Sequence, residues 1–173
     1  MAPPTVATEP TTPGALLLSL AITNGRPFKD HWAFFVGRTI NSPVGILLHA
    51  TGDVRSGFTF QIKRNLDWTR TSSRAQLVDL HWVAPAHFNE AMWNNGEYLT
   101  ETPGVPVCAF EESAASAPVP DRSLRAADDL AAPRTGRVIQ RNCQTWIVEA
   151  SEKLVEDGMI PEAVLEYLRD IKQ

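Results

Sequence analysis

The sequence predicts an α+β domain in which an antiparallel sheet of about five strands is packed with helices. Three observations indicate this class. Five apolar, strand-like runs follow one another between residues 15 and 83 with only short turns between them. Sustained helical spacing of apolar residues appears only after residue 142. The sequence shows no internal repeat, and its strands do not alternate with helices as they do in βαβ units. Strands first and helices last are typical of α+β folds.

The first strand-like run covers residues 15–22, a series of Leu, Ala and Ile interrupted only by Ser19. No basic segment precedes it, as would be expected in a signal peptide. It is also shorter than the ~20 apolar residues that a membrane-spanning helix needs. We therefore expect a buried strand here and no stable membrane anchor.

Four more strands are expected over residues 31–37, 44–49, 57–63 and 75–83, separated by turn residues such as Asn, Gly and Pro. Residues 57–63 alternate with period two, as a half-buried strand does. On residues 31–37, alternation leaves largely apolar side chains on both faces, so both should be buried. His31 begins the second strand and His49 ends the third.

Helices are expected mainly in the C-terminal part. Residues 85–93 predict a short helix with Pro85 in its first turn and Gly96 after its end. A further strand is expected around residues 105–110. From Asn142 onward, helical spacing continues until Gly158, and Pro161 begins the last helix.

The length of 173 residues suits one domain with a single core. We expect residues 15–173 to form this domain. Residues 1–14 hold four prolines and four threonines and little apolar surface, which predicts a disordered tail. Residues 111–133, rich in Ala, Ser, Pro and Asp, are expected to form a long flexible loop.

Charge and cysteine content limit the partners and the compartment. A net charge of −4 and a pI near 5.5 give no electrostatic reason to bind nucleic acid or an anionic membrane. Two cysteines are too few for a disulfide framework, so free thiols and a cytoplasmic location are the simpler expectation. A Cys108–Cys143 disulfide stays open as the alternative.

Cys143 is the candidate nucleophile because it follows Asn142, a good capping residue, in the first turn of a predicted helix. The helix dipole and free backbone N–H groups at such a position favour a thiolate and can hold an oxyanion. Buried cysteines usually only pack. Cys108, in an apolar stretch, is assigned to the core.

A cysteine nucleophile needs an imidazole base and a third group that orients the base. His31 and His49, on adjacent predicted strands, supply both. His81 is an alternative to His49 as the orienting group, and His87 is the weakest of the four histidines.

These residues also carry a resemblance to a known superfamily. The stretch His31-Trp32-Ala33-Phe34-Phe35-Val36-Gly37, then Leu48-His49, then Asn142-Cys143-Gln144-Thr145-Trp146 resembles the permuted papain-like group of the NlpC/P60 superfamily, which includes lecithin:retinol acyltransferase-like proteins. The resemblance implies a papain-like fold and a Cys143–His31–His49 site for thiol hydrolase or acyltransferase chemistry. It spans residues 28–150.

The sequence departs from the acyltransferases at Gln144-Thr145, where they have Glu-His, and no C-terminal membrane helix follows. We therefore expect a soluble small-molecule or peptide substrate with an amide, peptide or (thio)ester bond. Residues expected to contact it flank the site: Trp32, Asn142, Gln144 and Trp146. No residue cluster has metal-ligand spacing and no phosphate-binding glycine loop is present, so neither metal nor cofactor is expected.

Two alternatives remain open at this stage. One is a papain-like binding module without catalysis. The other is an isomerase or cyclase of a biosynthetic pathway that uses the same pocket for acid–base chemistry. The sequence leaves open the choice between hydrolysis, transfer and cyclisation, and the oligomeric state.

Overall fold

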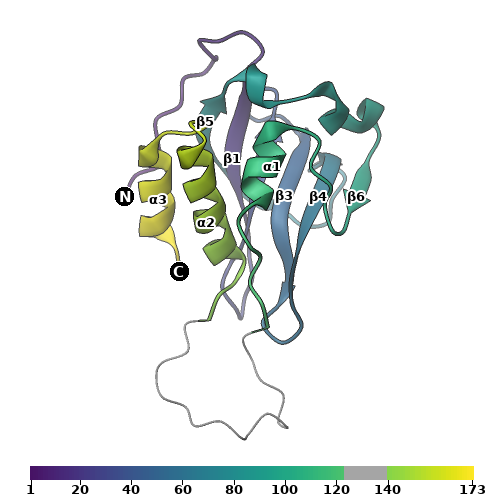
Figure 1. Cartoon of the computed structure of the whole chain (residues 1–173), viewed down its shortest axis with the longest axis vertical. Helices are drawn as coiled ribbons and strands as arrows, with labels where there is room; N and C mark the ends of the chain where they lie inside the picture. Colours follow the sequence, from purple (N-terminus) through teal and green to yellow (C-terminus); the bar gives the residue numbers. More distant parts are fainter. Residues whose placement is uncertain (123–139) are drawn as a thin grey trace, which may run out of the picture.

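A computed structural model describes residues 1–122 and 140–173. These residues form an α+β fold around one six-stranded antiparallel sheet, shown in Figure 1. The strands lie in the order β5-β1-β2-β3-β4-β6. Their bounds are β1 Leu16–Thr23, β2 His31–Gly37, β3 Val44–Asp53, β4 Gly57–Asp67, β5 Ala75–Val83 and β6 Leu99–Glu101. The prediction of an α+β fold with an antiparallel sheet of about five strands is confirmed, and the sheet has six.

The three α-helices of the described residues cover one face of the sheet (Figure 1). They are α1 Ala109–Ala115, α2 Cys143–Glu156 and α3 Glu162–Ile171. The main core lies between them and the sheet, and includes Trp32 and Phe34 of β2 and Trp146 of α2. The rings of Phe34 and Trp146 are 6.0 Å apart. Burial of these aromatic side chains fixes α2 against β2.

A smaller apolar cluster covers the other face of the sheet. Its buried members are Ala21, Ala33, Phe35, Leu47 and Leu66. The indole of Trp68 packs on Phe35 with ring centroids 5.6 Å apart. Both faces of β2 are therefore buried, as the sequence predicted, because successive strand residues alternate between the two clusters.

The strand predicted at residues 105–110 is wrong. Helix α1 takes up residues 111–115 of the predicted loop, while residues 116–122 contain no helix or strand. Cys108 precedes α1 as its N-cap, and the sixth strand lies earlier, at Leu99–Glu101. Glu111 of α1 is fully buried and pairs with buried Arg64 at 2.8 Å, which fixes the helix. A tertiary ion pair thus ordered a segment whose composition indicated a loop. Residues 123–133 of that predicted loop lie outside the described residues.

The helix predicted at residues 85–93 is also different in the structure. Two 3₁₀ segments, η1 Pro85–His87 and η2 Glu90–Gly96, replace it. Phe88 and Asn89 between them are extended, and the Asn89 side chain accepts from the N–H of Ala91 at 2.8 Å. This local side-chain bond begins a new turn and interrupts a continuous helix.

Residues 1–14 contain no helix or strand, and the Ala7 carbonyl accepts from Trp82 Nε1 at 2.9 Å. Their disorder stays a prediction. In the described part of the chain, every helix is too short or too polar to span a bilayer. Cys108 and Cys143 are both free, so the alternative disulfide is not formed.

Candidate functional site

Helix α2 begins at Cys143, as the sequence predicted. The side chain of Asn142 accepts from the backbone N–H groups of Gln144 at 3.1 Å and Thr145 at 3.2 Å. In return, the Thr145 hydroxyl accepts from the Asn142 N–H at 3.3 Å. This reciprocal cap satisfies helix donors that would otherwise lack partners and fixes the position of Cys143 in the first turn.

The Cys143 thiol lies where α2 meets the beginning of β2, and only 7% of the residue is exposed. Burial raises its pKa, although the backbone N–H groups of Trp32, Gln144 and Cys143 itself point at the sulfur and lower it. The sequence-based expectation of a thiolate at the helix start is therefore not met, because desolvation of the charged form prevails. The thiol is protonated at neutral pH.

His31 and His49 are hydrogen-bonded to each other. His31 Nε2 lies 2.7 Å from His49 Nδ1, and the two rings meet edge to face with centroids 5.0 Å apart. His49 Nε2 in turn lies 2.7 Å from Oε1 of Gln61, its register partner on β4. Gln61 Nε2 donates to the Thr102 hydroxyl at 2.7 Å. One continuous chain of hydrogen bonds thus runs from His31 to Thr102.

Both histidines of this pair are uncharged at neutral pH. Burial lowers the pKa of His49 to about 4; the bond to Gln61 opposes this shift, while the charges of His31 and Lys63 add to it. Burial, together with the charge of Lys63, also lowers the pKa of His31. A neutral imidazole retains a lone pair, so His31 is able to act as a base.

The sheet is open where these residues meet. Pairing of β2 with β3 begins at Phe34, opposite Leu48, and ends at Gly37, opposite Gly45. Strand β3 continues beyond this point and stays paired with β4 as far as Asp53, opposite Gly57. The first residues of β2 therefore pair with β1 alone. The N–H of Trp32, at this opening, is close enough to the Cys143 sulfur to lower the pKa of the thiol.

The thiol and the imidazole approach the opening from different sides. Trp32 belongs to the core that α2 covers, whereas Ala33 belongs to the cluster on the opposite face. Strand alternation places His31 on the side of Ala33. Within residues 1–122 and 140–173, no hydrogen bond joins the thiol to the His31 ring. The structure brings Cys143 to the residue next to His31 without a direct bond between the two side chains.

The four residues expected to contact substrate surround this junction. Trp32 is 2% exposed, and Trp146 is fully buried with its Nε1 donating to the Ala117 carbonyl at 3.1 Å. Gln144 is fully buried and donates from Nε2 to the Asp30 carbonyl at 2.9 Å. Asn142 caps α2. Gln144 and Asn142 thus fix the start of α2, Trp32 and Trp146 belong to the main core, and contact of the four with a substrate stays a prediction.

The structure separates the remaining histidines and the second cysteine from this site. His81 lies on β5 opposite Leu18, with β1 between it and β2, so His49 and not His81 is the partner of His31. His81 and His87 both line a cavity of about 140 Å³. Cys108 is buried in the main core, as predicted, and burial raises its pKa to about 11.

Gln61 and Thr102 are the site residues that the sequence reasoning missed. The one signal for either was the period-two pattern of residues 57–63, which places Gln61 on the opposite face from Phe58, Phe60 and Ile62. Its partner could not be read from that pattern, because the pairing of Gln61 with His49 depends on the β3–β4 register.

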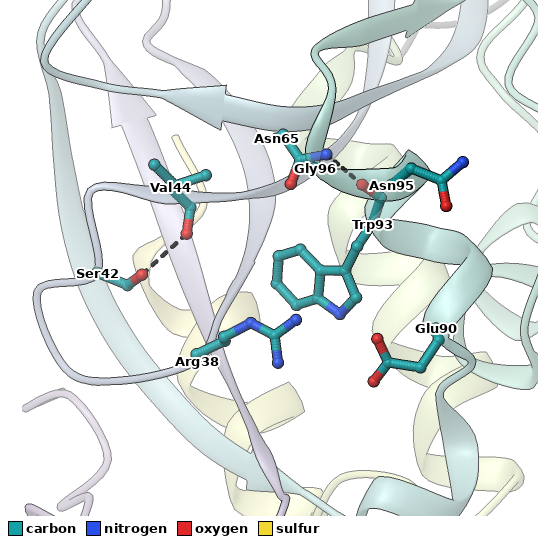
Figure 2. A pocket seen from close by; sticks show the side chains of 8 residues that line it. All are labelled: Arg38, Ser42, Val44, Asn65, Glu90, Trp93, Asn95 and Gly96. Atoms are coloured by element: carbon teal, nitrogen blue, oxygen red, sulfur yellow. Dashed lines mark hydrogen bonds between the residues drawn. The ribbon is translucent and has the colours of Figure 1, made fainter.

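A larger cavity, of about 480 Å³, lies beyond the other end of β2 (Figure 2). The Arg38 guanidinium lies over the Trp93 ring, 4.1 Å from its centroid, and both side chains form part of the cavity wall. The Asn65 side chain bonds the Trp93 carbonyl in the same wall. Arg38 directly follows β2 and His31 begins it, so the cavity is about 20 Å of strand away from the His31–His49 pair.

Among residues 1–122 and 140–173, no three His, Cys, Asp or Glu side chains gather closely enough to hold a metal ion. Comparison with curated proteins finds no match, and neither does comparison with solved structures. A family model described as DUF6540, a family of unknown function, matches residues 18–161, which include His31, His49 and Cys143. The chain belongs to the DUF6540 family.

Proposed function

We propose that this protein is a cysteine-dependent hydrolase or acyltransferase of the permuted papain-like type, with a Cys143–His31–His49 site. One observation carries the proposal. The side chain of Gln144, which follows Cys143, donates to the carbonyl of Asp30, which precedes His31. The His31 ring is in turn bonded to His49. This arrangement supports a site in which the nucleophile comes from a helix, and the neutral base and the group that orients it come from two strands.

The proposed reaction forms an acyl-enzyme on Cys143. The sulfur attacks the carbonyl carbon of an amide, peptide or (thio)ester while His31 Nδ1 accepts the thiol proton. The backbone N–H of Cys143 donates to the resulting oxyanion. When the intermediate collapses, the bond to the leaving group breaks and His31 returns the proton to that amine, alcohol or thiol. Water then releases the acyl group as an acid, or another acceptor takes it.

The charge states favour proton transfer during the attack and not before it. The thiol is protonated and the imidazole neutral in the free protein, because burial disfavours both charged forms. His31 Nε2 is bonded to His49, so only Nδ1 is available to the thiol. Catalytic hydrogen bonds are often long in free enzymes and shorten when substrate binds, so the missing direct bond is compatible with this role.

The helices and the free thiols of the described residues support a substrate class and a compartment. The described helices include none able to span a membrane, which fits a soluble small molecule or peptide better than a membrane lipid. Two free thiols fit a reducing compartment, so we propose the cytoplasm as the place of action. Hydrolysis is the default outcome, since water is the most abundant acceptor.

The test is acylation of Cys143 by small activated acyl donors. We would incubate the protein with p-nitrophenyl acetate and with an acetyl thioester, and locate the acetyl group by mass spectrometry. Wild type should be acetylated at Cys143, Cys143→Ala should not, and His31→Gln should react about 10²–10⁴-fold more slowly. Cys108→Ala is the matched control and should behave as wild type. Acetylation at Cys108 alone, or none in folded protein, overturns the proposal.

One observation favours a second candidate, a papain-like binding module without catalysis. Only 7% of Cys143 is exposed and, among the described residues, its thiol has no hydrogen bond to His31. A module of this kind would keep the fold and leave Cys143 unreactive. The same acylation experiment distinguishes the two candidates, because only the enzyme forms the Cys143 thioester.

A further inference from the structure

Three consecutive hydrogen bonds of 2.7 Å connect Thr102, Gln61, His49 and His31. In this chain Gln61 directs its amide nitrogen to the Thr102 hydroxyl and its amide oxygen to His49 Nε2. Of the four imidazole nitrogens of the two histidines, His31 Nδ1 is the one that takes no part in these three hydrogen bonds. Thr102 is exposed, so the chain begins at the surface and ends at the junction with α2.

We infer that Gln61, oriented by Thr102, is a positioning residue that determines which nitrogen of His31 carries the proton. Its effect on catalysis rests on the proposed function. The location of the proton does not, and it is measurable without any substrate.

The inference follows from counting donors and acceptors. An amide oxygen only accepts, so His49 Nε2 must carry a hydrogen and donate it to Gln61. A neutral imidazole has one N–H, which leaves His49 Nδ1 as an acceptor. His31 Nε2 must therefore donate to His49 Nδ1, and His31 Nδ1 keeps a free lone pair. The opposite polarity would place a hydrogen on His31 Nδ1, where it could not accept the thiol proton.

Neutrality of the pair is what makes this count valid. His49 is buried and His31 is half-buried, and this desolvation lowers both pKa values and favours a single N–H on each ring near pH 7. The groups facing them are the neutral Gln61 amide and the Lys63 ammonium, which disfavours a second positive charge. The neutral Gln61 amide thus sets the donor–acceptor direction of the hydrogen bonds and does not draw an additional proton onto either histidine.

The backbone holds Thr102 in place. Antiparallel pairing of β4 with β6 matches Ile62 to Glu101, so the next pair in register is Gln61 with Thr102. The segment after Thr102 stays close to β4, because the Gly104 N–H donates to the Phe60 carbonyl at 2.8 Å. A Cβ at Gly104 would lie only 2.6 Å from Ile62 Cγ1, so this approach requires glycine.

The test is the tautomer of His31, measured by long-range ¹H–¹⁵N correlation on protein labelled at histidine, at pH 7. Individual His→Gln variants assign the four rings. Wild type should show His31 protonated at Nε2. Gln61→Leu and Thr102→Val should shift His31 toward a mixture of both tautomers. The first removes the amide oxygen that accepts from His49, and the second leaves the Gln61 amide free to rotate. Thr102→Ser should keep the wild-type tautomer, since its hydroxyl can still accept from Gln61 Nε2. Gln76→Leu, on the exposed side of β5, is the matched control.

Two results overturn the inference: a wild-type His31 protonated at Nδ1, or a His31 that stays fully Nε2-protonated in folded Gln61→Leu and Thr102→Val. Thr102→Val alters an exposed side chain, so it keeps the test valid if Gln61→Leu does not fold.

Kinetics add a second readout if acylation of Cys143 is observed. Gln61→Leu should lower kcat at least about tenfold with little change in KM, since a wrong tautomer of a triad base costs up to ~10⁴ in rate. Thr102→Ser should restore what Thr102→Val loses. If the tautomer follows Gln61 but Cys143 is never acylated, the proposed function fails and the inference stands. If Cys143 is acylated but the tautomer does not depend on Gln61, the inference fails and the proposed function stands.

Discussion

The side-chain amide of Gln144 donates to the backbone carbonyl of Asp30 at 2.9 Å, so the residue after Cys143 is bonded to the residue before His31. The same side chain accepts from the N–H of Gln173 at 2.9 Å. Gln144 is fully buried, which makes both bonds costly to lose. This contact fixes the first turn of α2 against the beginning of β2, and with it the distance between thiol and imidazole.

Replacing Gln144 by leucine should therefore affect both stability and the site. The half-buried Asp30 carbonyl and the N–H of exposed Gln173 would lose their partner, and the loss of each hydrogen bond costs about 0.5–1.5 kcal/mol. We expect a lower free energy of unfolding in urea and slower acetylation of Cys143. Gln76→Leu on the exposed side of β5 controls for the loss of an amide. Wild-type stability and acetylation in Gln144→Leu would contradict this role.

Alkylation should reveal a protonated Cys143. Its pKa is raised by burial, so iodoacetamide should label it slowly at pH 7 and faster only as the pH rises above the usual range of a thiol. Cys108, with a pKa of about 11, should also be labelled slowly at neutral pH. His31→Gln should leave the labelling profile unchanged. Rapid labelling of Cys143 at pH 6–7, comparable with the urea-unfolded chain, would indicate a thiolate–imidazolium pair instead.

Acid should destabilise the protein through His49. The unfolded chain binds a proton on this histidine near pH 6.5, and the folded protein only near pH 4. Between these values the unfolded state binds more protons, so the free energy of unfolding falls with falling pH, by about 3 kcal/mol at most for this group. Urea unfolding between pH 7 and 4.5 measures the slope. His49→Gln should show a smaller slope, and an identical slope would mean that His49 titrates equally in both states.

The buried Arg64–Glu111 pair should be essential for stability. Arg64 bonds Glu111 twice, at 2.8 and 3.1 Å, and also Glu101 at 2.8 Å. Arg64→Met should cost about 3–5 kcal/mol, because Glu111 is left charged and unpaired in the core. The double variant Arg64→Met/Glu111→Leu should recover part of this loss in urea unfolding. Exposed Arg70→Met is the control. Additive losses in the double variant would argue against a coupled pair.

The candidate site was predictable from the sequence where local rules apply. Asn142 before an apolar helical pattern predicted the cap and placed Cys143 in the first turn, and both are found. His31 was predicted at the start of one strand and His49 at the end of the next, which lie side by side in an antiparallel pair. In the structure His31 Nε2 lies 2.7 Å from His49 Nδ1. Gln61 was not predictable, because its contact with His49 requires a specific register between two strands.

Sequence periodicity by itself determined β1 to β5, α2 and α3, because each buries an apolar face that repeats at strand or helix spacing. Only the tertiary structure decided α1 and the charge state of the site. Helix α1 depends on Glu111 reaching Arg64 from another element. The thiol at the helix start was expected to ionise, yet burial under the packed chain outweighs the nearby N–H groups and keeps it protonated. Desolvation is set by everything that surrounds a side chain, which no local pattern encodes.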